Sequence, residues 1–299
     1  MSQLSSATPR GQRLMTLTCP RARHVPGCLP FLALWACLTW PLAGQAAPAN
    51  AVRSPDSLAL ECPVPRYPEV TPEGSRARLR HWAQQALRPW GVSLGWHAEE
   101  GRSFADSPQD RARLRRLLDV VVPTLQRLPR SLLPRYRVRR VVLVKDLTVS
   151  GQYRLAMPAP ERDSVLLADN GTSLCDAGMA LRVLHELHHV FEFRDAGAYD
   201  RPDTAWRMLH DPVFRYGQGG ASAYGGHFVN RGHPSAGFVS AYAQFAQEED
   251  KAETFAWMLT PGYEARVQAW AQEDPQLAAK VSWMNAWLAR PPNGRLPRR

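Results

Sequence analysis

Five consecutive residues in the middle of the chain have the types and spacing of a metal-dependent hydrolytic site. They are His185-Glu186-Leu187-His188-His189, which contain the pattern H-E-x-x-H. Residues four apart lie one above the other on a helix, so the imidazoles of His185 and His189 can hold one Zn²⁺. Glu186 can reach a water molecule that the metal makes more acidic. The pattern therefore predicts a zinc centre in which Glu186 acts as general base and then as general acid.

A catalytic zinc needs a third protein ligand and an open position. His188 points about 100° away from its neighbour on a helix, so we expect it to be a polar neighbour of the site rather than a ligand. The motif does not continue as H-x-x-G-x-x-H, because Glu192 stands in the place of the glycine and Asp195 in the place of the last histidine. Asp195 remains a candidate ligand with a shorter side chain.

A downstream acidic segment, YAQFAQEEDKAETFA at residues 242–256, offers the other candidates. Glu249 and Glu253 are one helical turn apart, and Tyr242 falls two turns earlier on the same face if the helix extends back that far. The three glutamates of the segment, Glu248, Glu249 and Glu253, are all candidates for the third ligand by residue type.

H-E-x-x-H followed by E-x-x-A-E-x-F-A, with a tyrosine seven residues before the first glutamate, resembles the gluzincin metallopeptidases typified by the catalytic domain of anthrax lethal factor, which include the bacterial Pro-Pro endopeptidases. The resemblance spans residues 110–260 and implies Glu249 as the third zinc ligand. It also implies Glu253 as support for a ligand histidine and Tyr242 as a group that assists the transition state. Nothing marks the Pro-Pro preference.

Members of that family have a strand along the active-site cleft. The resemblance makes Ser164–Ala168 the candidate for such an edge strand, which would pair with an extended peptide. A buried core strand is the alternative for the same residues.

The apolar periodicity predicts the elements that position these residues. Strands are expected at 136–147 and 163–168, the second ending in the turn Asp169-Asn170-Gly171. Helices are expected at 76–87, at 111–128 with an interruption or bend at Pro123, at 176–193 with Asp176 as N-cap, at 237–259 and at 264–288. The expected fold class is α+β, a zincin-like metallopeptidase domain with a small mixed or antiparallel sheet, the H-E-x-x-H helix and a helical C-terminal part.

Residues 198–237 are rich in Gly, Tyr, His and Pro and form too long a connection for a simple turn. Such loops commonly bind a ligand. Two roles stay open for its side chains, shaping a substrate pocket or packing the loop itself, and the residues concerned are Tyr216, Tyr224, His227 and His233.

Four arginines precede an apolar run at residues 28–43, and the small residues Ala43–Ala47 follow it. This order predicts a secretory signal peptide, residues 1–46, cleaved after Ala46. A signal anchor is the alternative, and translation could start at Met1 or Met15. The mature protein is expected to be secreted or periplasmic, without a stable membrane anchor.

Three segments follow the leader: a Pro-rich linker or strap at 47–75, a metallopeptidase domain at 76–290 with its catalytic core at 136–262, and a basic tail at 291–299. The strap could also be an inhibitory pro-segment. Two cysteines remain after cleavage, Cys62 and Cys175, and an exported protein would join them in a disulfide. Two buried thiols are the alternative.

Composition excludes several classes of protein. A chain of 299 residues with 44% hydrophobic residues can form a sizeable core and is not disordered throughout. The formal charge of +10 falls to +6 once the four arginines of the leader are removed. The remaining basic residues are almost all arginines scattered along the chain, so no nucleic-acid partner is expected.

The sequence thus predicts an exported zinc-dependent metalloendopeptidase with one Zn²⁺ per chain and a peptide or protein substrate. A peptidoglycan-peptide endopeptidase or amidase would use the same centre. Two other classes are a non-catalytic zinc-containing envelope binding protein and a basic nucleic-acid or envelope-binding module, the latter suggested by charge alone. The natural substrate, the cleaved bond and the oligomeric state do not follow from the sequence.

Overall fold

The computed structural model describes residues 66–169, 175–223 and 230–290, all of them within the unit Ala49–Arg299. The predicted leader, the Pro-rich segment as far as residue 65 and the basic tail lie outside these ranges. In the described part of the chain, no helix combines the length and the apolar character needed to cross a membrane.

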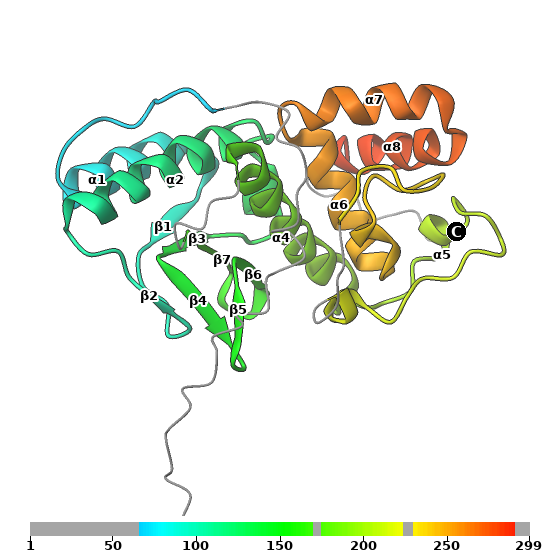
Figure 1. Ribbon diagram of the computed structural model, residues 1–299, viewed down its shortest axis with the longest axis horizontal. Coiled ribbons are helices and arrows are strands. Elements are labelled where there is room, and N and C mark those ends of the chain that lie inside the picture. Colours follow the sequence, from blue (N-terminus) through cyan, green and yellow to red (C-terminus); the bar gives the residue numbers. More distant parts are fainter. Residues whose placement is uncertain (1–65, 170–174, 224–229, 291–299) are drawn as a thin grey trace, which may run out of the picture. The chain divides into compact units, whose positions relative to one another are not determined.

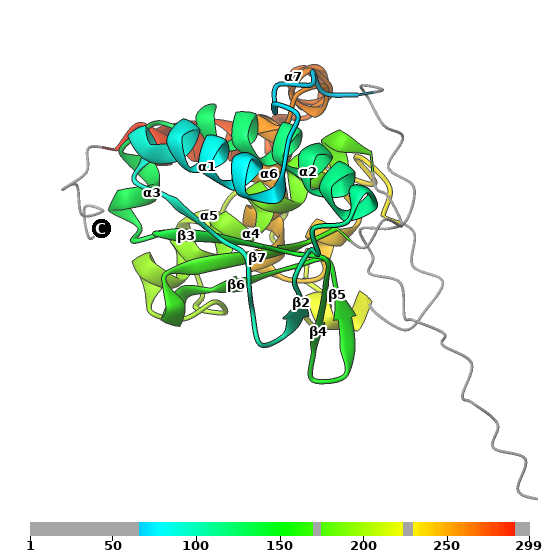
Figure 2. The same cartoon turned by 90° about the vertical axis from the view of Figure 1, so that its left-hand side faces the viewer.

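A four-stranded mixed sheet underlies the predicted site (Figure 2). Its strands, in spatial order, are β1 (Ser93–Gly95), β3 (Arg140–Val144), β7 (Ser164–Ala168) and β6 (Ala156–Ala159). The first three run parallel, and β6 is antiparallel to β7. The inner strands read RVVLV and SVLLA, near-continuous branched apolar runs that are typical of strands covered on both faces.

A smaller antiparallel sheet consists of β2 (Gly101–Arg102), β4 (Asp146–Val149) and β5 (Gln152–Arg154). The predicted single strand at 136–147 is therefore wrong, because β3 and β4 belong to different sheets. Tyr136 ends the short helix α3 (Leu132–Arg135), and Arg137 has a left-handed φ of 57°, so the strand cannot begin there.

Helix α4 (Asp176–Ala196), which carries the H-E-x-x-H motif, lies at the centre of the described fold (Figure 1). It contacts β6 and β7 of the mixed sheet and packs against two other helices, α2 and α6. The predicted α+β class, with a small sheet, the motif helix and a helical C-terminal part, is confirmed. The remaining helices are α1 (Arg76–Leu87), α2 (Pro108–Gln126), α5 (Thr204–Arg207), α6 (Gln247–Leu259), α7 (Tyr263–Glu273) and α8 (Pro275–Leu288), with 3-10 turns η2 (Arg88–Trp90), η3 (Pro160–Arg162), η4 (Gly220–Ala223) and η5 (Tyr242–Gln244).

The two faces of the mixed sheet are both buried. Alternate strand residues point to opposite faces, and those on the helix side join the main core that α2 and α4 also line. Residues on the other face form a smaller apolar cluster, made of Ala98, Val142, Val144, Leu147, Ala159, Leu166 and Ala168. Burial on both sides fixes the sheet and, through it, the position of α4.

The predicted helix bounds agree best with the structure in the N-terminal half of the described fold. The predicted helix at 76–87 matches α1, and α2 continues through Pro123 to Gln126 without interruption. The predicted helix at 264–288 is two helices, because Asp274 caps α8 and Pro275 occupies its first position. The predicted start at 237 is wrong, since α6 begins only at Gln247.

Asp176 is not the N-cap of α4, because Cys175 occupies that position. The Asp176 carboxylate instead accepts hydrogen bonds from the Tyr67 backbone N–H at 2.6 Å and from Arg116 Nε at 3.1 Å. It thereby joins the described end of the Pro-rich segment to α2 and α4. Cys175 is disulfide-bonded, and Cys62, its predicted partner, lies outside the described residues.

Candidate metal centre

Three side-chain atoms from two helices converge beside the mixed sheet. His185 and His189 project from consecutive turns of α4, and their Nε2 atoms are 3.0 Å apart. Glu249, in the first turn of α6, places Oε2 3.1 Å from Nε2 of His185 and 3.4 Å from Nε2 of His189. All three residues are at least nine-tenths buried. They form a group that could hold a metal ion.

Glu253, one turn along α6 from Glu249, fixes the orientation of the His185 ring. Its Oε1 lies 2.9 Å from Nδ1 of His185, and its Oε2 accepts hydrogen bonds from Ser240 Oγ at 2.6 Å and Trp257 Nε1 at 3.2 Å. A carboxylate can only accept, so Nδ1 of His185 carries the proton and donates it. In the neutral imidazole, the Nε2 lone pair then faces His189 and Glu249.

This arrangement favours a proton or a cation among the three groups. Lone pairs of two imidazoles and a carboxylate point at one another within hydrogen-bond distance, which is repulsive unless a proton or a metal lies between them. Two imidazole nitrogens and one carboxylate oxygen are a common donor set for catalytic Zn²⁺. A ligand histidine that donates its other N–H to a carboxylate is the usual support for such a site.

The protonation equilibria of the metal-free site show the same demand for positive charge. Burial alone would lower the pKa of His185, but its hydrogen bonds with Glu249 and Glu253 outweigh burial and raise this pKa well above the usual value. Burial alone would raise the pKa of Glu249, but hydrogen bonds from His185 and His189 hold it well below its usual range. Hydrogen bonding in the metal-free site therefore favours a positive charge beside Glu249.

Tyr242 reaches the site by a route that the sequence did not indicate. It lies on η5 rather than on α6, because Ala246 is fully extended between the two elements. The expectation that the helix extends back to Tyr242 is therefore wrong. The Tyr242 hydroxyl nevertheless reaches the metal group and donates a hydrogen bond to Oε1 of Glu249 at 3.0 Å.

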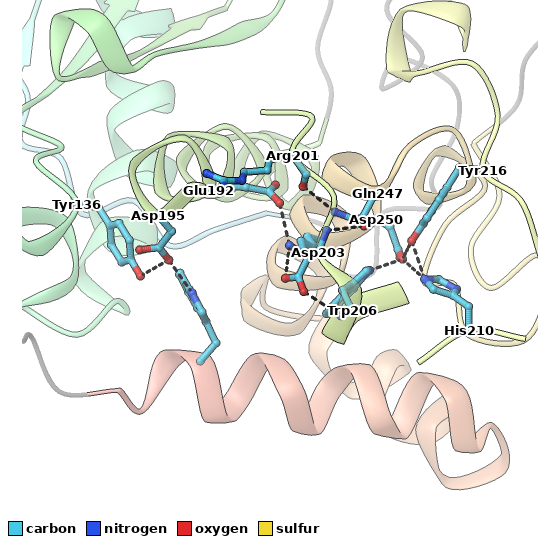
Figure 3. Close-up of polar contacts among 12 residues, drawn as sticks. Tyr136, Glu192, Asp195, Arg201, Asp203, Trp206, His210, Tyr216, Gln247 and Asp250 are labelled. Atoms are coloured by element: carbon cyan, nitrogen blue, oxygen red, sulfur yellow. Dashed lines mark hydrogen bonds and ion pairs between the residues drawn. The ribbon is translucent and has the colours of Figure 1, made fainter. Parts of the chain in front are cut away.

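Among the other candidate ligands, Glu248 lines the pocket beside the metal group without belonging to it, and Asp195 is occupied elsewhere. Asp195 Oδ2 accepts hydrogen bonds from Tyr136 Oη at 3.0 Å and Trp287 Nε1 at 3.2 Å, on the side of α4 shown in Figure 3. Glu192 forms an ion pair with Lys251 of α6 at 2.9 Å, and α4 passes through both acidic positions to Ala196 without turning. The helix thus continues where the H-x-x-G-x-x-H pattern would require a turn, and the acidic residues at these positions form contacts within the fold.

His188 points away from the other two histidines of the motif. Its ring packs against Phe255 and Trp287, with centroid distances of 5.3 and 5.5 Å. Burial, followed by the charge of Lys251, holds the pKa of His188 well below its usual value, so the ring is neutral. It supports the packing of α4 against α6 and α8.

A pocket of about 480 Å³ opens beside the metal group. Glu186 lies in its wall together with the two histidines, Tyr242, Glu248 and Glu249. Sequence reasoning missed Tyr199, Arg154 and Glu161, which also line the pocket. Tyr199 follows closely after α4 and could have been suspected from that proximity. Nothing in the sequence marks the other two.

The edge strand at the pocket is β6 and not the predicted Ser164–Ala168. Those residues form β7, which lies between β3 and β6 and is buried along its whole length. Ala156, Met157 and Pro158 of β6 line the pocket instead. The sequence does not reveal β6 because Pro158 lowers its strand propensity, although an edge strand tolerates proline.

The long loop contributes packing at its two described candidate positions. Tyr216 donates a hydrogen bond to Asp250 at 2.7 Å, and His233 stacks on Trp270 with a centroid distance of 5.0 Å. Neither residue lines the pocket. Tyr224 and His227 lie outside the described residues.

No protein-family model matches the chain, and no curated protein matches it. A solved structure of a candidate zinc-binding metallo-peptidase from Bacteroides caccae is similar, with 15% sequence identity and a TM-score of 0.42. The alignment covers 70% of this chain and 83% of that chain. Because both measures of similarity are low, the assignment of the site depends on the residues of this chain alone.

The raised pKa of His185 predicts that zinc binding depends on pH. The pKa of His189 is raised as well, and below these pKa values the metal must displace one or two protons, so the apparent zinc affinity should increase about ten- to a hundredfold per pH unit and level off above them. Competition against a chromophoric chelator over a pH series measures this. An affinity that does not change from mildly acidic to alkaline pH would contradict the assignment of His185 as a ligand.

Proposed function

We propose that the protein is a zincin-like, zinc-dependent metallopeptidase that hydrolyses peptide bonds and holds one Zn²⁺ per chain through His185, His189 and Glu249. The observation that carries this proposal is the convergence of Nε2, Nε2 and Oε2 of these residues beside Glu186 in one pocket. A site that served only to stabilise the fold would have no use for a pocket with the carboxylate of Glu186 and the phenol of Tyr242 in its wall.

Zinc bound at this group would make a water molecule more acidic and polarise a carbonyl group. Glu186 is only partly buried and lies next to His185 along the helix, so its carboxylate can take the proton of the attacking water. It then delivers that proton to the nitrogen of the departing amine. Tyr242, which lines the same pocket, is proposed to stabilise the negative charge that develops on the carbonyl oxygen.

The free edge of β6 suggests how a substrate is held. The Ala168 N–H donates to the Leu155 carbonyl, and hydrogen bonding alternates along an antiparallel pair. The N–H and C=O of Ala156 and the C=O of Pro158 therefore point away from β7. We propose that an extended peptide pairs with these groups, which favours a polypeptide over a compact small molecule as substrate.

Export to the periplasm or the exterior remains a prediction from the leader, which lies outside the described residues. The substrate is proposed to be a peptide or protein. Digestion of purified peptidoglycan sacculi, compared with digestion of a denatured protein, distinguishes this proposal from the peptidoglycan alternative.

Glu186→Gln should retain zinc and lose hydrolytic activity by a factor of about 10²–10⁴, because the amide cannot accept the proton of the water. Turnover of a fluorogenic peptide mixture and elemental analysis of the same samples measure both quantities. Glu161→Gln, a change to another glutamate of the pocket, is the matched control and should retain activity. Full activity of a zinc-loaded Glu186→Gln protein would refute the proposed mechanism.

Tyr242→Phe should lower kcat by about 10²-fold while the protein still binds zinc, because one group that stabilises the transition state is lost. The hydroxyl also holds Oε1 of Glu249, so zinc content must be measured on the same samples. If loss of zinc accounts for the whole loss of activity, Tyr242 only orients the ligand and takes no part in the reaction.

A further inference from the structure

Gly220 makes the closest approach of any glycine to the metal centre among the described residues. An ideal Cβ at this position would lie 1.9 Å from Oε1 of Glu249 and 2.5 Å from the Tyr242 hydroxyl. Both distances are far below a van der Waals contact. The chain at Gly220 therefore passes directly against the ligand carboxylate, and any side chain there would require the Glu249 carboxylate or the Tyr242 hydroxyl to move.

Backbone hydrogen bonds hold this stretch of chain in place. The Gly217 N–H donates to the Gln244 carbonyl at 3.0 Å, and the Gly219 N–H donates to the Phe245 carbonyl at 2.9 Å. Gln244 is the last residue of η5, which carries Tyr242, and Phe245 follows it on the way to α6, which carries Glu249. The run Gly217–Gly220 is thus fastened to the part of the chain that joins two residues of the site.

The residues that lead to Gly217 are anchored to the two residues of α6 that follow Glu249, and Figure 3 shows these polar contacts. Trp206 Nε1 and Tyr216 Oη donate hydrogen bonds to Oδ2 of Asp250 at 2.8 and 2.7 Å. Asp203 accepts a hydrogen bond from Lys251 Nζ at 2.8 Å. Asp250 and Lys251 follow Glu249 directly in the sequence and are buried, so the first turn of α6 is held from both sides.

We propose that Gly220 is a positioning residue of the metal centre. Oε1 of Glu249 is enclosed between the Gly220 backbone and the Tyr242 hydroxyl, which leaves Oε2 directed at the two histidines. Gly220 thereby leaves room for the orientation in which one carboxylate oxygen lies beside Tyr242 and the other faces the metal position. The long loop, which the sequence suggested as a substrate-binding element, thus packs against the ligand carboxylate through this segment. The proposal rests on the proposed role of Glu249 as a ligand.

A comparison of two alanine variants tests the proposal. Gly220→Ala should weaken zinc binding by about 10–100-fold, the range typical of lost support to a ligand. Gly217→Ala is the matched control in the same run, because its Cβ would meet nothing closer than 3.4 Å, and its affinity should stay close to that of the native protein. Competition of Zn²⁺ with a chromophoric chelator measures both. Equal affinities of the two variants would overturn the proposal.

A second measurement, on metal-free protein, separates this contact from the proposed function. Gly220→Ala should lower the melting temperature or prevent folding, and most of this loss should disappear in a Glu249→Ala background, where the carboxylate is absent. An equal loss in both backgrounds would overturn the proposal, since the contact with Tyr242 or the loop itself, rather than the carboxylate, would then be the cause. Failure of the native protein to bind zinc would refute the metal site while leaving this test of the contact valid.

Discussion

The packing of α4 against α6 is the contact on which the site depends, because each helix alone carries only part of the donor set. α4 supplies two imidazoles and α6 supplies the carboxylate that faces them. The same interface holds the ion pair between Glu192 and Lys251 and the hydrogen bond between Glu253 and His185. A displacement of one helix along the other would break all of these contacts together. The sheet and the other helices serve to hold this pair of helices in register.

The acidic start of α6 explains how one short helix can serve both the site and the fold. Glu249 and Glu253 face the histidines, whereas Asp250 and Lys251 face the long loop, α4 and α8. Every one of these charges is buried, and a buried charge that loses its partner is strongly destabilising. The charged segment at the start of α6 has a composition that would suit a solvent-exposed helix face, but its charges are buried and paired. Lys280 of α8 completes it with a contact of 2.7 Å to Asp250.

The sequence was informative wherever the determinants are local. The spacing of His185 and His189 on one helix face follows from helix geometry alone, and the apolar runs of β7 and α1 identify these elements. The position of Tyr242 could not be derived, because it depends on an extended Ala246 that no propensity indicates. The edge position of β6 and the close approach of Gly220 are set by chain segments far apart in the sequence. Only the family resemblance singled out Glu249 as the third ligand, because residue type and spacing also allowed Glu248 and Glu253.

The proposed metal centre depends most on Glu249, the ligand that α6 brings to the histidines. Metal content of dialysed protein comprising residues 47–299 tests this directly, with a Glu249→Ala variant beside it. Asp195→Asn is the matched control, because Asp195 bonds to Tyr136 and Trp287 away from the site. The account predicts about one zinc per chain in the native protein and the control, and little or none in Glu249→Ala. Full zinc content in Glu249→Ala, or none in the native protein, would contradict it.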